Sequence, residues 1–393
     1  MTAVVSESRI LITCPNRIAP FLAEEVLALG MPVAAELPAG VLTDGTMHDA
    51  MRLNLHVRTG HRVLYLLDEF EAYDPDEMYS WVKQIEWERW LDVDGYVSVV
   101  SSIDTPSIDN TQFANVRCKD AIVDRMVEQL GNRPDSGSRT DRAVVFLYWH
   151  EEVCAVYLDT SGDSLSNRGY RRIPWKAPMR ETLAAAVVLA TGWKGDGNFV
   201  NPMCGSGTLA IEAAMIATSR APAMLRENFG FMHLSDFDRS AWDAMRAEAR
   251  RASRKRIDGR IIASDINPDA IVAARRNAAT AGVDHLIEFH VGDFAESPIP
   301  DDGGVVVLNP EYGARLGDEA KLLGIYSAIG DFFKQSCSDY TGYIFTGNPQ
   351  LAKRVGLRTK RRLPFFNSTI DCRLLEFELY SGSRKHLPTT ASE

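Results

Sequence analysis

The stretch NFVNPMCGSGTLAIEAAMIA, residues 198–217, decides the fold class of this 393-residue chain. A short apolar run ends at Asn201-Pro202, glycines follow at 205 and 207, and an alanine-rich run with helical spacing comes next. Glycine permits positive φ and close backbone approach at a strand-to-helix turn. The free N–H groups at the start of the helix can bind a carboxylate or phosphate. The stretch therefore predicts a strand, a ligand-binding loop and a helix.

The same alternation of strand and helix extends through the rest of this half of the chain. An alanine-rich helix is predicted over 179–193, and short β-branched runs cover 259–268, 286–293, 304–310, 341–349 and 374–382. This pattern predicts an α/β fold with a mostly parallel, doubly wound, Rossmann-like sheet. The glycine loop lacks the third glycine and the nearby acid of a nicotinamide-binding fingerprint. Dinucleotide binding is therefore not indicated.

Polar residues gather at the ends of the predicted strands. Open α/β sheets bind ligands beyond the carboxyl ends of their strands. Asp265 could accept the hydroxyls of a ribose, and Asp293 could contact an adenine amino group, although either acid taken alone is more often a helix cap or a surface residue. Asn-Pro dipeptides also occupy such positions, and they begin at residues 201, 267, 309 and 348. For 267 and 348 we favour ordinary turn chemistry, because Asn-Pro is a common turn dipeptide.

The tetrapeptide Asn309-Pro310-Glu311-Tyr312 suits methyl transfer to an exocyclic amine of a base. Such a nitrogen is a poor nucleophile, because its lone pair is delocalised into the ring. The Asn309 side-chain oxygen and the Pro310 carbonyl could hold its two hydrogens, while Tyr312 stacks on the base for about 1–3 kcal/mol. Positioning and electrostatics would carry this reaction without a covalent intermediate. An Asn-Pro turn beside a core tyrosine is the structural alternative, and the tetrapeptide alone does not decide between them.

The first half of the chain has a different pattern. Strands are predicted at 9–14 and 96–103, and a pair joined by a tight turn is predicted within 142–162. Helices are predicted at 19–30, 76–91 and 111–131. We therefore expect an α+β region that ends near residue 165.

Composition narrows the classes of function. The net charge of -10 is located in residues 1–110, which carry 7 Lys and Arg against 18 Asp and Glu. The nearly neutral remainder has basic clusters at 168–180, 246–260 and 353–362 that could neutralise phosphates. No apolar run is long enough for a membrane span. Six scattered cysteines predict neither disulfides nor a metal site, and the default location is a reducing cytoplasm.

Longer stretches resemble a known family. The methyltransferase domain of the ribosomal RNA large subunit methyltransferase L family is similar to NPMCGSGTLAIEAAMIA (201–217), SDINPDAIVAARRNA (264–278), VGDF (291–294) and LNPEYGARLG (308–317). The THUMP RNA-binding module of that family resembles NTQFANVRCKDAIVD (110–124) and SGDSLSNRGYR (161–171). Similarity continues in FTGNPQLAKRVGL (345–357) and FFNSTIDCRLLEFEL (365–379).

The resemblance implies a class I methyltransferase that uses S-adenosylmethionine to make N2-methylguanine in 23S ribosomal RNA. It implies a ferredoxin-like plus THUMP region over 1–165, a linker over 166–179, the methyltransferase domain over 180–383 and a tail over 384–393. The implied catalytic residues are Asn309, Pro310, Glu311 and Tyr312. The implied cofactor-binding residues are Asn201, Met203, Cys204, Gly205, Ser206, Gly207, Asp265, Ile266, Asp293, Phe294 and Asn309. RNA contacts are expected from Arg168, Tyr170, Arg171, Arg172, Lys360, Arg361 and Arg362.

The chain departs from the family pattern in three places. Glu311 stands where the tetrapeptide usually has proline, and its carboxylate either points to solvent or accepts from the N1–H and N2–H edge of guanine. Asn201 stands where an aspartate is usual, which would change the cofactor contacts modestly. No second methyltransferase domain follows, so we do not expect the 7-methylguanine activity that such a domain would supply.

Other functions remain open on the sequence. A tRNA guanine-N2 methyltransferase would also carry a THUMP module. An adenine-N6 DNA methyltransferase would share the Asn-Pro-x-Tyr chemistry, but the THUMP-like half argues against it. A non-catalytic RNA-binding or assembly factor would follow if Glu311 abolished turnover. A cytosine-C5 mechanism needs a nucleophilic cysteine, and Cys204 in the glycine loop is better suited to packing.

Overall fold

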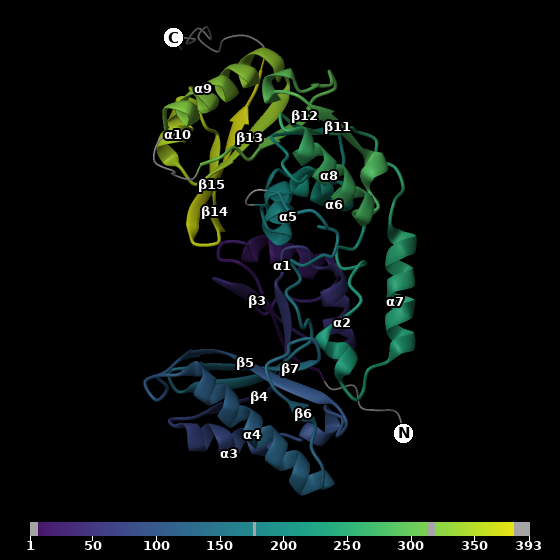
Figure 1. Cartoon of the computed structure of the whole chain (residues 1–393), viewed down its shortest axis with the longest axis vertical. Helices are drawn as coiled ribbons and strands as arrows, with labels where there is room; N and C mark the ends of the chain where they lie inside the picture. The colour runs from purple at the N-terminus through teal and green to yellow at the C-terminus, as the bar shows by residue number, and fades with distance from the viewer. Residues whose placement is uncertain (1–6, 176–177, 313–318, 381–393) are drawn as a thin grey trace, which may run out of the picture. The chain divides into compact units, whose positions relative to one another are not determined.

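The computed structural model describes residues 7–175, 178–312 and 319–380 (Figure 1). Lys176, residues 313–317 of the last methyltransferase-like stretch and the predicted tail 384–393 lie outside the described residues. Two compact units make up the chain. Unit 1 contains residues 1–169, 181–186 and 220–253, and unit 2 contains residues 170–180, 187–219 and 254–393.

Unit 1 is built on one eight-stranded sheet. Its strand order is β2 (Ala35–Leu37), β3 (Gly40–Gly45), β1 (Ser8–Thr13), β4 (Arg62–Glu71), β8 (Val153–Asp159), β7 (Ala143–His150), β5 (Tyr96–Asp104) and β6 (Asp135–Ser136). Strands β4 and β8 pair antiparallel with an irregularity between Leu66 and Asp68. Glu151, at the predicted turn between β7 and β8, has a positive φ of 52°. The predicted strand pair is therefore confirmed.

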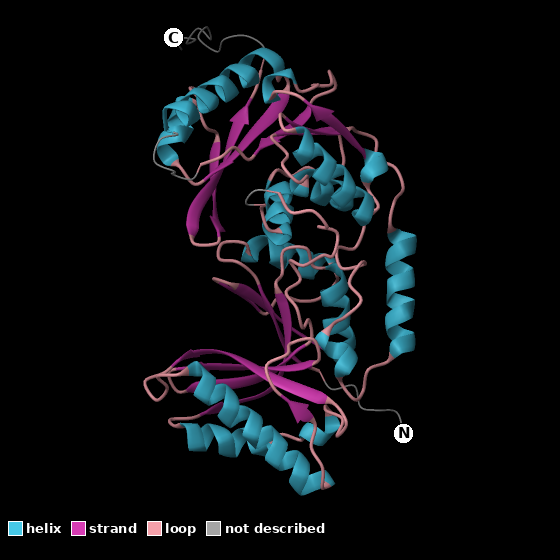
Figure 2. Cartoon of the chain, in the orientation of Figure 1, coloured by secondary structure: helices cyan, strands magenta, loops and turns pink. Residues whose placement is uncertain are grey.

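Four helices of unit 1 pack with their buried residues toward its core. They are α1 (Ala19–Ala28), α2 (Met47–His56), α3 (Pro75–Gln84) and α4 (Thr111–Leu130). Helices α3 and α4 lie side by side, and α4 packs on β5 (Figures 1 and 2). The helix predicted over 76–91 ends early, and a 3-10 turn, η1 (Trp87–Arg89), follows it. The turn buries Trp87 completely, and its Nε1 donates to the Val82 carbonyl.

Residues 220–253 belong to unit 1 rather than to the Rossmann-like unit. This segment contains η2 (Gly230–His233) and α7 (Arg239–Ala252). Arg226 donates to the carbonyls of Ser161 and Ser164, at 2.9 and 2.7 Å. Trp242 is fully buried and packs edge-on against Phe231 at 5.0 Å. We expected one uninterrupted domain over 180–383, but these contacts join the insertion to the first unit.

Unit 2 contains the predicted doubly wound sheet. Its order is β11 (Ile287–Val291), β10 (Ile261–Asp265), β9 (Asn198–Pro202), β12 (Gly304–Leu308), β13 (Tyr340–Thr346), β15 (Ile370–Glu378) and β14 (Arg361–Asn367). Pairing is parallel from β11 to β13, and β15 and β14 are antiparallel. Because β9 and β12 lie side by side, the chain reverses direction across the sheet there, where such folds bind ligands.

The helices of unit 2 follow its strands. Helix α6 (Thr208–Ala217) contacts β9 and β10, and α8 (Pro268–Ala281) contacts β10 and β11. Helix α9 (Glu319–Ser336) contributes Ile329, Phe332 and Phe333 to a core with Val306 and Ile344. Helix α10 (Pro349–Arg354) packs on α9, and short 3-10 turns η3 (Asp284–Leu286) and η4 (Phe294–Glu296) flank β11. Helix α5 (Glu181–Ala190) is divided between the two units.

Two observations concern the classes of site that the described residues can form. No helix in the described ranges has an apolar stretch that could cross a membrane. Over those same ranges, no group of three or more His, Cys, Asp and Glu residues is placed to hold a metal ion. All six cysteines are free thiols.

Candidate functional site

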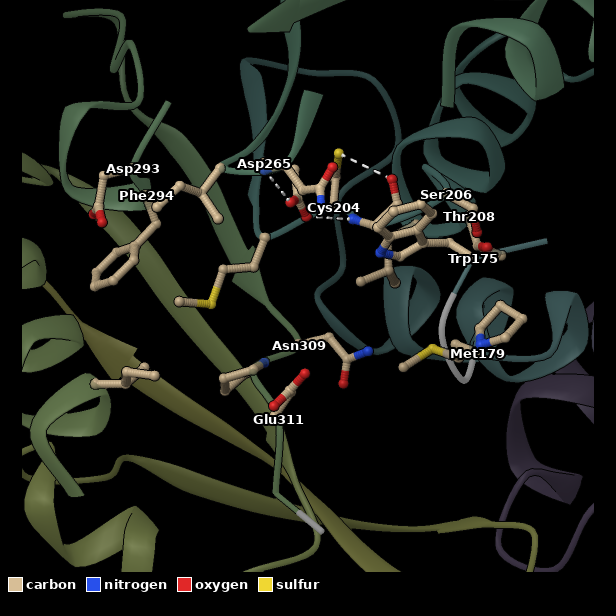
Figure 3. A pocket seen from close by; sticks show the side chains of 18 of the residues that line it. Trp175, Met179, Cys204, Ser206, Thr208, Asp265, Asp293, Phe294, Asn309 and Glu311 are labelled. Atoms are coloured by element: carbon tan, nitrogen blue, oxygen red, sulfur yellow. Dashed lines mark hydrogen bonds between the residues drawn. The ribbon is translucent and has the colours of Figure 1, made fainter. Parts of the chain in front are cut away.

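A cavity of about 520 Å³ opens at the carboxyl ends of β9, β10 and β12, within unit 2. Its volume lies in the range of small-molecule and cofactor sites. Figure 3 shows Asp293 and Phe294 at one end and Trp175 and Met179 at the other. The residues that line it are Trp175, Pro178, Met179, Met203, Cys204, Gly205, Ser206, Thr208, Leu209, Asp265, Ile266, Asn267, Asp293, Phe294, Asn309, Pro310, Glu311, Lys321, Leu322 and Ile325.

The glycine loop between β9 and α6 forms one wall. Met203, Gly205 and Gly207 all have positive φ, of 58°, 55° and 82°. A Cβ on Gly207 would lie 2.9 Å from the Cβ of Ala274, so this position requires glycine for close packing against α8. Gly207 is the N-cap of α6, and no side chain caps that helix. Its first N–H groups are therefore available to an anionic group.

Two carboxylates stand at neighbouring strand ends of the cavity. Asp265, at the end of β10, accepts the N–H of Gly205 at 2.9 Å and the N–H of Asn267 at 2.9 Å. These two bonds fix the orientation of the carboxylate beside the glycine loop. Asp293 follows β11, accepts the N–H of Ala295 at 2.9 Å and caps η4. A half-buried, oriented carboxylate pair of this kind suits hydroxyl and amino donors of a nucleoside.

Asn309, Pro310 and Glu311 leave β12 and line the same cavity. The side-chain oxygen of Asn309 is buried and has no hydrogen-bond partner among the described residues. An unpaired buried acceptor costs about 1–3 kcal/mol, so its presence calls for an explanation such as a ligand. Glu311 is exposed, and Figure 3 shows its carboxylate beside Asn309.

Tyr312 lies outside the cavity lining. Its hydroxyl accepts from Asn367 Nδ2 at 2.8 Å, and its ring meets Phe345 edge-on at 6.2 Å. A Cβ on Gly347 would lie 3.0 Å from the Tyr312 ring, so the glycine leaves room for it. Burial raises the pKa of the Tyr312 hydroxyl, which keeps it protonated. The structure thus holds the ring against β13 and β14.

Two predicted cofactor contacts do not line the cavity. Asn201 is fully buried, and its Nδ2 donates to the Val307 carbonyl at 2.8 Å, which joins β9 to β12. Gly207 supports the loop from behind through its contact with Ala274. The predicted contacts that do line the cavity are Met203, Cys204, Gly205, Ser206, Asp265, Ile266, Asp293, Phe294 and Asn309.

The chain matches three family models in sequence order. Residues 9–64 match the RlmL ferredoxin-like domain, residues 72–159 match the THUMP domain, and residues 168–376 match the RMKL-like methyltransferase domain. The last match covers more than half of the chain. The chain belongs to the RMKL-like methyltransferase family. This family is one of S-adenosylmethionine-dependent enzymes, so the predicted family, fold and cofactor class are confirmed.

Relatives and solved structures agree with this membership. The chain is 36% identical over 377 residues to ribosomal RNA large subunit methyltransferase K/L of Syntrophotalea carbinolica, covering 93% of this chain and 53% of that protein. The same enzyme of Pseudomonas paraeruginosa is 36% identical over 378 residues, covering 94% and 52%. The chain thus spans about half the length of the curated relatives it matches.

Two crystal structures share the fold over nearly their whole length. A protein named as a methyltransferase complexed with SAH has a TM-score of 0.87 and 26% identity, covering 96% of this chain and 99% of that one. A possible methylase from Clostridium difficile 630 has a TM-score of 0.88 and 28% identity, covering 97% and 100%. Both of these proteins therefore match this chain over residues of both units.

Within this family member, the first group of predicted RNA contacts needs correction. Arg168 is 0% exposed, and its guanidinium donates to the carbonyls of Leu165 and Arg58. Tyr170 is 1% exposed, and its hydroxyl donates to Glu212 Oε1 at 3.0 Å. Because buried side chains do not reach an RNA strand, we assign Arg168 and Tyr170 structural roles.

The remaining basic residues differ in how far they are engaged. Arg171 donates to the Thr208 hydroxyl at 3.2 Å and to the Met179 carbonyl at 2.6 Å. Lys360 and Arg361 both pair with Glu376, whose side chain is 4% exposed. Arg172 and Arg362 are exposed. Lys360 and Arg361 are exposed as well, so these four predicted RNA contacts remain accessible.

Sequence reasoning missed one end of the cavity. Trp175, Pro178 and Met179 line it, although they lie in a segment that we assigned to a linker. The sequence feature that could have indicated these residues is Trp175 between two prolines, Pro174 and Pro178, in a short segment between domains. Lys321, Leu322 and Ile325 of α9 also line the cavity. Their helical spacing predicts only a helix, so the sequence did not point to them as ligand-binding residues.

Cys204 lines the cavity but is not suited to nucleophilic attack. Burial first, and the nearby Asp265 carboxylate second, raise the pKa of the Cys204 thiol. A raised pKa keeps the sulfur protonated at neutral pH, whereas nucleophilic cysteines need a lowered pKa. This electrostatic setting disfavours a cytosine-C5 mechanism.

Proposed function

We propose that this chain transfers a methyl group from S-adenosylmethionine to the exocyclic N2 amine of a guanine in 23S ribosomal RNA, in the cytoplasm. The observation that carries the proposal is the buried, unpartnered side-chain oxygen of Asn309 in the wall of the cavity. An acceptor held there without a partner of its own can take a hydrogen from an incoming amine.

The cavity fits the cofactor in size and in chemistry. Asp265 can accept the ribose hydroxyls, and Asp293 with Phe294 can hold an adenine ring at one end. The N-terminus of α6 and the Gly205–Ser206 backbone can bind the carboxylate of the methionine part. Among the described residues, a Cβ added to Gly205 would have one heavy atom within 4 Å, Trp175 Cδ1 at 3.7 Å, so the loop leaves room for close approach. When bound there, the cofactor supplies a methyl group made electrophilic by its positive sulfur.

The residues of the chain then act on the amine. The Asn309 oxygen and the Pro310 carbonyl accept its two hydrogens, which turns the nitrogen lone pair toward the cavity. Holding reactants in such a geometry supplies a large part of a rate enhancement. The guanine has to leave its stack to reach these acceptors, as for other enzymes that modify bases. Tyr312, fixed by Asn367, offers the base a ring beside this point.

Glu311 suggests how guanine is selected. The Watson–Crick edge of guanine presents two adjacent donors, N1–H and N2–H, whereas adenine presents an acceptor at N1. A carboxylate beside Asn309 matches the guanine edge and opposes the adenine edge. We expect Glu311→Gln to lower the rate of guanine methylation by about ten-fold, the value of one charged hydrogen bond. An unchanged rate would mean that Glu311 is a solvated side chain.

RNA as the partner is supported by the THUMP match and by the names of the relatives. The accessible Arg172 and Arg362 provide positive charge on the methyltransferase unit, and phosphate contacts of this kind dominate RNA affinity. The guanine-N2 target itself rests on the Asn309 and Glu311 geometry. We therefore treat base and RNA class as separate parts of the test.

The test is methyl transfer from labelled S-adenosylmethionine to 23S fragments, tRNA and DNA, followed by mass mapping of the modified base. We expect N2-methylguanine in 23S RNA, and methyl transfer that is slower by about 100-fold or more with Asn309→Ala. Label on tRNA alone would move the substrate to that RNA, and N6-methyladenine would contradict the proposed base. Retained RNA binding without any label would favour a non-catalytic assembly factor.

A further inference from the structure

The segment 170–175, here called the strap, runs from the end of unit 1 into the cavity wall. Its last residue, Trp175, lies against the glycine loop, with its Cδ1 3.7 Å from where a Cβ on Gly205 would lie. The strap contains no helix or strand, so its backbone groups need partners other than a regular ladder. One side chain of α8 supplies several of them.

That side chain is Asn277, which is 1% exposed. Its Oδ1 accepts the N–H groups of Arg172 and Ile173, at 2.9 and 3.0 Å. Its Nδ2 donates to the Ile173 carbonyl at 3.0 Å and to the Ser206 carbonyl at 3.2 Å. Both lone-pair positions and both hydrogens of the amide are thus used.

The four bonds join two parts of the same cavity wall. Ser206 belongs to the glycine loop, and the strap ends at Trp175, so Asn277 ties the loop to the strap from behind. Neither the strap nor the glycine loop belongs to α8, the helix that carries Asn277. Asparagine is a poorer helix former than the alanines that surround it in α8, so a local preference for helix does not account for the residue.

The strap has further anchors on α6. Tyr170 bonds the buried Glu212, and Arg171 bonds Thr208, the first residue of the helix. Arg171 also reaches the carbonyl of Met179, another residue of the cavity wall. These bonds hold the start of the strap, whereas Asn277 holds its middle and the glycine loop together.

We propose that Asn277 is a positioning residue for cofactor binding, because it sets the distance between the strap and the glycine loop. It touches no atom of the proposed ligand and acts through Ser206 and Trp175. The inference rests on the proposed function, since it assumes that the cavity binds the cofactor. It also means that cofactor binding and order in the strap are coupled, and such coupling is reciprocal.

The first test measures S-adenosylhomocysteine binding by calorimetry for wild type, Asn277→Ala and Asn277→Asp. We expect Asn277→Ala to raise the Kd about ten-fold or more, in line with the loss of several buried hydrogen bonds. Asn277→Asp keeps the acceptor for the Arg172 and Ile173 N–H groups but presents a carboxylate to the Ser206 carbonyl. We expect it to weaken binding while those two amides stay protected. The control is Arg276→Ala, an exposed neighbour on α8 that should bind as wild type.

The second test uses the unaltered chain, so it does not depend on whether a variant folds. Hydrogen exchange of the Arg172 and Ile173 amides should slow when S-adenosylhomocysteine saturates the protein. Exchange that is the same with and without ligand, or variants that melt earlier yet bind within two-fold of wild type, would overturn the inference. Wild-type protein that does not bind the probe would instead overturn the proposed function.

Discussion

The four Asn-Pro dipeptides of unit 2 stand at equivalent strand ends and yet fall into two groups. Asn267 accepts the N–H of Asp269 at 2.9 Å and caps α8, and Asn348 accepts those of Gln350 and Leu351 at 3.0 and 3.1 Å and caps α10. In both cases the proline is the first residue of the helix, where its missing N–H costs nothing. The turn chemistry that we favoured for these two is confirmed.

Asn201 and Asn309 cap no helix, and the side-chain oxygens of both are buried without a partner among the described residues. The two asparagines differ in what their side-chain amides contact. Asn201 bridges β9 to β12 through its Nδ2, whereas Asn309 faces the cavity. The same dipeptide therefore serves as a cap or a strand bridge and, in our proposal, as a ligand group, and the difference lies in which hydrogen-bonding atoms the fold leaves unused.

The largest expected effect follows from removing the unused acceptor in the cavity. Asn309→Ala should lower kcat by about 100- to 1,000-fold, the cost of losing one preorganised group that acts on the reacting atoms. Its stability should change little, because the deleted oxygen has no partner among the residues that the structure describes. Single-turnover methyl transfer measures the first quantity, and chemical denaturation measures the second.

The matched control is Asn348→Ala, the same change at a capping site. It should leave the rate of methyl transfer within two-fold of wild type, since Asn348 is not part of the cavity lining. If both variants lost activity equally, the distinction between capping and cavity asparagines would fail. If Asn309→Ala kept full activity, the proposed acceptor role would be wrong.

Asp265 tests the same distinction between residues of the cavity and residues that cap helices. Asp265→Asn removes the charge that we assign to the ribose hydroxyls, so the Kd for S-adenosylhomocysteine should rise by about 10- to 100-fold. Asn348→Ser, which keeps a capping oxygen and lies outside the cavity lining, should bind the ligand nearly as wild type. Calorimetry on both variants gives the comparison, and equal affinities would remove Asp265 from the site.

Asn201→Ala should act on stability instead of on binding. Losing the amide leaves the Val307 carbonyl without this bond in a buried setting, which costs about 1–3 kcal/mol. We expect a lower denaturation midpoint at an unchanged slope, with cofactor affinity within about three-fold of wild type. A large loss of affinity at full stability would place Asn201 in the site, as the resemblance implied.

The methyltransferase fold and most of the cofactor wall could be predicted from the sequence. Strand-helix alternation, the glycines at 205 and 207, and the acids at 265 and 293 are local signals, and parallel strands bring their ends together. The structure places Gly205, Asp265, Asp293 and Asn309 around one cavity, as expected from that rule. These residues needed no knowledge of distant contacts.

What could not be predicted depends on contacts between segments far apart in sequence. Nothing local in Arg168 shows that its guanidinium donates to the carbonyl of Arg58, which lies 110 residues earlier, so its basic neighbourhood suggested RNA. The insertion 220–253 belongs to unit 1, although the segments on either side of it belong to unit 2. Arg226 and Trp242 make the contacts that hold it there. Trp175 ends the strap, whose Arg172 and Ile173 amides are bonded by Asn277, about 100 residues later in the chain.

The smallest expected effect returns to the capping group. Asn348→Ala removes the acceptor for two N–H groups at the start of α10, which should destabilise the protein by about 1 kcal/mol. Asn348→Ser restores a capping oxygen, so its denaturation midpoint should lie closer to wild type. Neither variant should alter ligand affinity, since the cavity draws no atom from this helix. Equal stability of the alanine and serine variants would show that the cap contributes nothing, and the two groups of dipeptides would then differ in geometry without differing in energy.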